Sequence, residues 1–202
     1  MNGRLEVRRK IGHILLGLII VIGFYLEIME ERHLFFAIIF VAILSMLSLK
    51  LRIPIVSFLL RKFERESVVG NFPFKGALFF LGGALLAVRL FSRDIAMASI
   101  IILTFGDSVS LLFGKFLGKI KLNFNELKNI EGILAGMFAA FIGALFFVNI
   151  IEAFFASLIA MVVEGAGFKI GVSDVDDNLI VPLVAGTVIY LFRTNFMVFR
   201  IF

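Results

Sequence analysis

The residues best suited to chemistry lie in the stretch FGDSVSLLFGKFLGKIKL, residues 105–122. Asp107 ends an apolar run, and an ionisable side chain there is costly to bury, which makes it a functional candidate. Small residues recur every four positions along the stretch: Gly106, Ser110, Gly114 and Gly118. Such a stripe lets another backbone or a ligand approach closely, and on its own it is more typical of helix packing.

Three lysines follow within the same stretch: Lys115, Lys119 and Lys121. A carboxylate, a glycine-lined approach and several cations together suit a polyphosphate, because Mg²⁺ bridges carboxylates to phosphate oxygens and lysines add positive charge. The stretch is not a Walker A loop, since GKFLGK has too few residues between its glycines and no Ser or Thr follows. The alternative is that a neighbouring lysine neutralises Asp107 only to hold two helices together.

Further polar residues stand at the start of later apolar segments. Lys128, Glu131 and Gly132 precede one of them, where a glutamate also suits a helix N-terminus. The last segment is headed by a polar group: Asp174, Asp176, Asp177 and Asn178. Capping explains one of these acids, so the others favour a site. Near the N-terminus, His13 stands one turn after two basic residues, and both a structural role and a site role are open for it.

These residues need a scaffold, and the composition predicts a membrane protein. Hydrophobic residues make up 61% of the 202, and 26 residues are Phe, well beyond a soluble domain. About 20 apolar residues cross the hydrocarbon core. The candidate spans are 11–28, 34–49, 74–91, 95–114, 132–150, 151–165 and 179–195. Several are short or carry polar residues, so we expect seven or six spans. Residues 1–202 are predicted to form one all-α polytopic membrane domain.

Two segments need separate treatment. Segment 50–72 is too charged to span, and its mixture of apolar and basic residues is typical of a helix at the membrane interface. Such a helix would anchor the domain or act as a lid over a lipid headgroup. The N-terminus imitates a signal peptide but lacks a cleavage site, so we expect a retained first helix. The chain has no cysteine, which excludes disulfides and cysteine metal sites.

The distribution of positive charge predicts the orientation. With a cytoplasmic N-terminus and seven spans, 15 of the 20 Lys and Arg residues lie on the cytoplasmic side, a clear positive-inside bias. The net charge of +5 is therefore topological and does not indicate nucleic acid. We expect the loops 115–128 and 166–178 to meet in one cytoplasm-facing cleft, and the outer turns to carry no polar constellation. A transporter is disfavoured, because no repeat is visible and the charges gather at one face.

GDSVSLLFGKFLGKIK followed by LKNIEG resembles the nucleotide-binding signature of CTP-dependent lipid-alcohol kinases. That family includes dolichol, polyprenol and phytol kinases and the fungal CTP-dependent diacylglycerol kinase, and it is related to the CDP-diacylglycerol synthases. The matching residues are Gly106, Asp107, Gly114, Gly118, Lys121, Lys128, Glu131 and Gly132. RRKIGH also resembles the kinases' R-K-x-x-H, and DDNLIVPL their D-N-x-x-x-P ending, whereas the P-G-H-G-G segment of the cytidylyltransferases is missing. Two positions depart from the pattern, with Ser110 in place of alanine and Asn129 in place of Ser or Thr.

The resemblance implies a kinase that phosphorylates the hydroxyl of a membrane isoprenoid alcohol, of dolichol or polyprenol type, from CTP at a cytoplasm-facing site. It implies Mg²⁺ held by Asp107, Glu131 and Asp177, with Asp177 or His13 as the general base. The residues expected to bind CTP are Gly106, Gly114, Lys115, Gly118, Lys119, Lys121, Lys128, Gly132 and Asn178. Because a neutral amide is easier to bury than a carboxylate, an Asp107→Asn variant is expected to fold and to lose turnover.

Several alternatives stay open at this stage. A CTP:phosphatidate-type cytidylyltransferase would use the same ion and nucleotide but would form a CDP-activated lipid. The lipid acceptor is not fixed by any motif, since no stretch of sequence identifies the alcohol. The protein would be integral to the membrane, the cytoplasmic membrane if its source is prokaryotic, and a homodimer is as compatible with the sequence as a monomer.

Overall fold

The computed structural model describes residues 3–51, 54–64, 69–122, 125–167, 169–170, 173–174 and 176–199. Its helices are α1 (Gly3–Tyr25), α2 (Glu31–Lys50), α3 (Pro54–Phe63), α5 (Lys75–Leu90), α6 (Arg93–Leu117), α7 (Ile130–Ala144), α8 (Ile150–Ala166) and α9 (Asp177–Phe199). Each apolar segment expected to span the membrane lies largely within one of these helices, and part of the expected interfacial segment forms α3. The prediction of an all-α fold is therefore confirmed.

Two helices, α2 and α6, are long and apolar enough to cross a membrane, judged by length and composition. They differ sharply in burial. The most apolar window of α6 is 78% buried inside the protein, whereas that of α2 is 11% buried. The count of seven spans stays a prediction, because the other described helices do not meet the same test.

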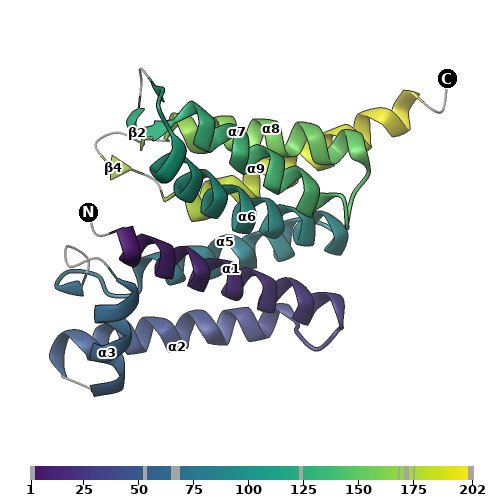
Figure 1. The fold of residues 1–202 in the computed structure, drawn as a ribbon. Coiled ribbons are helices and arrows are strands. Elements are labelled where there is room, and N and C mark those ends of the chain that lie inside the picture. The colour runs from purple at the N-terminus through teal and green to yellow at the C-terminus, as the bar shows by residue number, and fades with distance from the viewer. Residues whose placement is uncertain are drawn as a thin grey trace.

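Helix α6 is the centre of the bundle (Figure 1), where it packs against α1, α5, α7, α8 and α9. Every residue from Ile95 to Thr104 is buried, as expected for a helix that is apolar on all sides. Helix α2 lies at the edge and packs on α5. The site residues that α6 carries are therefore held by the best-packed element of the fold.

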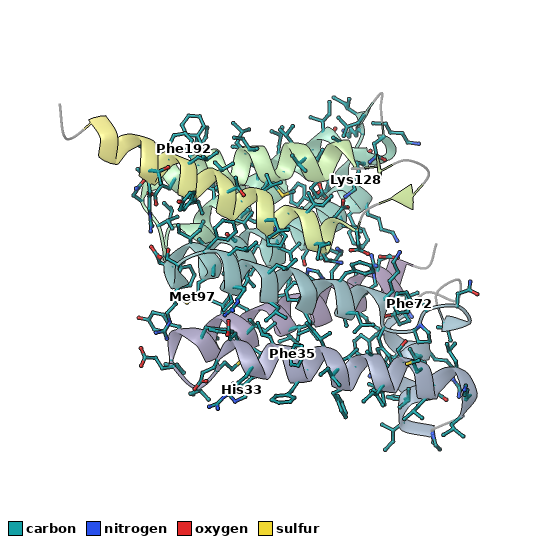
Figure 2. The ribbon with its side chains drawn as sticks, turned by 180° about the vertical axis from the view of Figure 1, so that it is seen from behind. His33, Phe35, Phe72, Met97, Lys128 and Phe192 are labelled. Carbon is teal, nitrogen blue, oxygen red and sulfur yellow. The ribbon has the colours of Figure 1, made fainter. Side chains whose placement is uncertain are left out.

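The chain runs back and forth between two ends of the bundle (Figure 1). The N-terminus, α3 and the hairpins between α6 and α7 and between α8 and α9 lie at one end, which we call the N-terminal end. The turns after α1, α5 and α7 lie at the opposite end, which we call the far end. In Figure 2, Lys128 and Phe72 lie toward the N-terminal end, and His33 and Met97 toward the far end. The sequence predicted this grouping of the basic loops on one side.

Two short hairpins replace what the sequence predicted only as loops. Strand β1 (Lys121–Leu122) pairs antiparallel with β2 (Asn125–Asn129). Strand β3 (Lys169–Ile170) pairs antiparallel with β4 (Ser173–Asp174), with Lys169 opposite Asp174. The first hairpin turns the chain from α6 into α7, and the second turns it from α8 into α9. Both hairpins fix where the polar residues next to them enter the bundle.

Helices α6 and α7 approach closely through the small-residue stripe. A Cβ atom on Gly132 would lie 2.5 Å from the carbonyl oxygen of Ser110, and one on Gly136 would lie 2.6 Å from that of Gly106. Side chains would not fit there without moving the helices apart. The stripe is therefore occupied by the backbone of α7, which is the packing role that such stripes typically have.

We expect Gly132→Ala to destabilise the fold by about 1–3 kcal/mol, because the new methyl group overpacks the α6–α7 contact. Gly76 in α5 is the matched control, since a Cβ there meets no atom within 4 Å. Gly76→Ala should change stability by about 1 kcal/mol or less, in the stabilising direction. Denaturant unfolding of both variants in detergent measures the difference. Equal stability of Gly132→Ala and Gly76→Ala would contradict the close approach of α6 and α7.

Candidate functional site

The first part of the site is a buried ion pair between α1 and α6. Lys10 on α1 donates a hydrogen bond to the carboxylate of Asp107 on α6, and both side chains are buried. His13, one turn further along α1, has its Nε2 atom 3.5 Å from the same Asp107 oxygen. The His13 ring packs edge-on against Phe80, with centroids 4.5 Å apart. The packing brings together two motifs that the sequence placed far apart.

Close packing of α1 on α6 sets this geometry. The buried residues of α1, which include Lys10, Gly17 and Ile20, lie on one side of the helix. A Cβ on Gly17 would clash with the side chain of Thr104, so α1 can dock this closely only because residue 17 is glycine. Lys10 and His13 then lie against the last turns of α6, where Asp107 is found.

The second part of the site centres on Lys128, whose side chain extends from β2 into the bundle. Its ammonium forms an ion pair with Glu164 of α8 and lies 3.5 Å from a carboxylate oxygen of Asp177 of α9. Burial alone would lower the pKa of Lys128, but the carboxylates of Glu164, Asp107 and Asp177 raise the pKa above its ordinary value. Lys128 therefore stays charged and lies within electrostatic range of Asp107.

Glu164, like Lys10, is a site residue that the sequence analysis did not predict. Its side chain is 0% exposed, and it also accepts a hydrogen bond of 3.4 Å from the hydroxyl of Ser110. The signal was present, since Glu164 lies near the end of the apolar segment 151–165, and the rule that singled out Asp107 applies to it equally.

The start of α9 contributes an oxygen-rich turn. The side-chain amide of Asn178 donates to Asp176 (2.7 Å), and so does the backbone N–H of Asn178 (3.2 Å). The Oδ1 atom of Asn178 is buried and has no donor among the described residues. The side chain of Asp174 lies outside the described residues. Asp177 therefore presents a carboxylate beside Lys128, and the neighbouring Asn178 presents an unpaired amide oxygen at the start of α9.

Glu131 takes a different position from the one the resemblance implies. Its carboxylate accepts hydrogen bonds from the backbone N–H groups of Lys119 and Ile120, at 3.1–3.2 Å, and the residue is half-buried. Those amides follow the end of α6, and the last residue of that helix lies about 15 Å along the helix axis from Asp107. The structure thus does not bring Glu131 next to Asp107. Its local role is to hold the loop that leaves α6.

Asn129, the departure from the kinase pattern, also binds this loop. Its side-chain amide donates a 2.6 Å hydrogen bond to the carbonyl oxygen of Gly114. That carbonyl belongs to the last turn of α6 and also accepts the backbone N–H of Gly118 at 3.1 Å. A Cβ on Gly118 would lie 2.4 Å from the Asn129 side chain. Four glycines that the resemblance assigns to CTP binding therefore have a packing role in this structure: Gly106, Gly114, Gly118 and Gly132.

The remaining basic residues of the stretch surround the same end of the bundle. Lys115, Lys119 and Lys121 are all solvent-exposed, and none forms an ion pair within the described chain. The three lysines make the N-terminal end positive next to the buried cluster, with the Glu131 carboxylate offsetting part of the charge of Lys119. An incoming anion would meet these lysines first.

The donors of the cluster suit Mg²⁺ in type. Mg²⁺ prefers oxygen ligands and is usually held by one or two carboxylates together with substrate phosphates. Asp107 and Asp177 supply carboxylates, and Asn178 supplies the unpaired buried oxygen. Across the described ranges, no three His, Asp or Glu side chains converge on a metal position as they stand. These residues therefore supply oxygen donors of the type that Mg²⁺ prefers.

The expectation that the outer turns carry no polar constellation is wrong. At the far end, Arg193 of α9 bonds Glu152 of α8 at 3.0 and 3.1 Å and also pairs with Asp94 of α6. These residues are too widely separated in the chain for spacing to reveal the cluster. A hollow of about 580 Å³ also opens at this end, with Phe24, Met97 and three glutamates in its lining. Those glutamates all pair with arginines, which is typical of a structural network.

Comparison with known proteins gave no match, whether against protein-family models, curated proteins or solved structures.

Proposed function

We propose that the protein is an integral membrane enzyme that transfers the γ-phosphoryl group of CTP to the hydroxyl group of a lipid alcohol. The observation that carries this proposal is the meeting of Lys10, Asp107, Lys128 and Asp177 at one end of the bundle. They come from separate stretches, and Lys10 and Asp107 alone are 97 positions apart. Each stretch independently resembles part of the lipid-alcohol kinase signature, so their convergence supports one shared site.

The exposed surface of α2 supports a location in the membrane. Phe35, Phe36, Phe40 and Met46 are each more than half exposed, and Figure 2 shows Phe35 projecting outward from the bundle. A continuous apolar face of this kind is unusual on a soluble monomer. We place the bilayer around α2 and the other long helices. The positive-inside bias assigns the N-terminal end to the cytoplasm.

In this proposal, Lys115, Lys119, Lys121 and Lys128 neutralise the phosphates of CTP. Asp107, Asp177 and Asn178 would hold Mg²⁺, which would supply positive charge to the phosphate groups. Catalysis of phosphoryl transfer is mainly positioning and neutralisation of charge, and the cluster supplies both. Lys10 forms an ion pair with Asp107, and this ion pair holds the carboxylate in place before CTP and Mg²⁺ bind.

The transfer also requires removal of the proton from the hydroxyl group of the lipid alcohol. A bond forms between the lipid oxygen and the γ-phosphorus, the bond from that phosphorus to the bridging oxygen breaks, and CDP leaves. The proton passes to a base within hydrogen-bond reach. Asp177 is better placed for this role than His13, because its side chain is 32% exposed whereas that of His13 is 13% exposed.

Position-specific labelling tests the reaction. With purified protein, Mg²⁺ and a lipid alcohol, we expect label from the γ-phosphate of CTP to enter the lipid and label from the α-phosphate to stay in the nucleotide. Transfer of α-label to a phosphatidate would instead show a cytidylyltransferase. If neither label enters any lipid of a panel of alcohols and phosphatidate, the proposal is wrong.

The acceptor is proposed to be a long isoprenoid alcohol of the dolichol or polyprenol type. Its tail can remain in the bilayer, so the enzyme has to bind only the hydroxyl end. Competition among dolichol, polyprenol, phytol and diacylglycerol for γ-label measures the preference. Transfer to diacylglycerol alone, or equal use of ATP, would refute the assignment of acceptor or donor.

A further inference from the structure

Helix α3 lies where the lipid-facing helix α2 ends at the N-terminal end of the bundle. It packs on α1, with Val56 and Leu60 buried, while Ile55 and Phe58 are 74% and 59% exposed. A short helix with one buried face, an exposed apolar face and basic residues is typical of the membrane interface. If the bilayer surrounds α2, α3 lies at the depth of the lipid headgroups.

A hollow of about 440 Å³ lies between α3 and the start of α1, and it is lined by Arg8, Phe58, Arg61 and Lys62. Three of these four residues are cations and none is acidic. Within the described chain, none of the three cations forms an ion pair with a carboxylate. Lys62 lies over the Phe58 ring, 5.3 Å from its centroid, which orients its ammonium beside the hollow.

The arginine at the centre of this group is partly fixed by the backbone. The Nε of Arg61 donates to the carbonyl oxygen of Ser57 at 3.3 Å. No described group accepts a hydrogen bond from its two terminal nitrogens. Arginine presents such nitrogens to phosphate oxygens in a planar fork. The hollow therefore offers a forked donor from Arg61 with further positive charge from Arg8 and Lys62.

This hollow is separate from the Asp107 cluster. Arg8 and Lys10 are two positions apart on α1, so they project about 200° from each other around the helix. Lys10 is buried against α6, whereas Arg8 is exposed toward α3. A ligand in the hollow would thus lie on the other side of α1 from the proposed phosphoryl-transfer site.

We propose that the hollow of Arg8, Phe58, Arg61 and Lys62 binds the phosphate of an anionic phospholipid headgroup from the surrounding leaflet. The unpaired cations supply the charge complementarity, and the exposed Ile55 and Phe58 suit the acyl region just below the headgroup. Basic residues at this depth attract anionic lipids strongly. The inference uses the membrane location proposed above but not the chemistry of the reaction.

Native mass spectrometry of the purified protein in detergent, titrated with phosphatidylglycerol or phosphatidylcholine, tests the inference. We expect wild type to retain phosphatidylglycerol preferentially. The triple variant Arg8→Gln, Arg61→Gln, Lys62→Gln should bind it roughly tenfold more weakly or worse. The control triple variant Arg4→Gln, Lys50→Gln, Lys75→Gln removes the same charge at the same end of the bundle and should bind nearly as wild type does.

Equal weakening in the two triple variants would refute the inference, because it would show a general effect of charge. Equal retention of phosphatidylcholine, or displacement of phosphatidylglycerol by millimolar inorganic phosphate, would refute the assignment to an anionic lipid. The conservative pair Arg61→Lys, Lys62→Arg keeps the charge and should retain most of the binding. Circular dichroism confirms that each variant is folded. Phosphoryl transfer need not be active for this test, so its outcome is independent of the labelling experiment.

Discussion

We expect Asp107→Asn to lower the rate of the proposed phosphoryl transfer by about a thousandfold or more, the largest expected effect of any single substitution on activity. The amide keeps the size of the side chain but removes the charge that faces Lys10 and that would hold Mg²⁺. Turnover is measured with γ-labelled CTP at saturating lipid. Activity near that of wild type would show that Asp107 serves only in packing.

The structure changes the expectation for the folding of this variant. The sequence predicted that a neutral amide would be harmless, but Lys10 is buried against the carboxylate and would lose its counter-charge. Removing one partner of a buried ion pair costs about 3–5 kcal/mol. Glu152→Gln is the matched control, since it removes a buried carboxylate paired with Arg193 at the far end. Both variants should lose stability, and only Asp107→Asn should lose turnover.

Lys128→Met is expected to give a large loss of stability. The substitution leaves Glu164, which is 0% exposed, without its counter-charge, and the expected cost is about 3–5 kcal/mol in the free energy of unfolding. Adding Glu164→Gln should restore most of that loss, because the double variant buries no unpaired charge. Denaturant unfolding of the two single variants and the double variant gives the coupling energy directly.

Lys115→Met is the control for this cycle, because Lys115 is exposed and forms no ion pair within the described chain. Its stability should change by about 0.5 kcal/mol or less. The double variant Lys128→Met, Glu164→Gln should be folded but inactive. If the double variant lost as much stability as the two single variants together, the ion pair between Lys128 of β2 and Glu164 of α8 would be contradicted.

The helices were largely predictable because long apolar runs have few alternatives to helical structure. Segment 95–114 predicted α6 (Arg93–Leu117) almost to its ends. Segment 132–150 was less accurate, since α7 ends at Ala144 and a turn follows. Apolar residues continue through that turn, so composition alone could not locate it. The hairpins were missed because strands as short as β1 carry no periodic pattern.

The site was predictable in part. Asp107 stood out because a carboxylate in an apolar helix is rare, and loops on one side of a bundle can meet, as Lys128 and Asp177 do. The sequence could not predict which charged residue pairs with which partner. Lys10 rather than a lysine of the 115–121 stretch neutralises Asp107. Glu131, predicted as a metal ligand from its place in the motif, is bound to the backbone of the loop after α6. Such choices depend on tertiary distances.

The ion pair between α1 and α6 also has a consequence for biosynthesis. Lys10 precedes its partner by 97 residues, and ribosomes add roughly 5–20 residues per second. For several seconds the first helix therefore exists without Asp107, the residue with which Lys10 pairs in the folded protein. A long side chain near a helix end can extend toward the headgroups during that interval. Insertion of α1 and its docking onto α6 are then separate events, and the N-terminal helix reaches its final position only after the middle of the chain has been made.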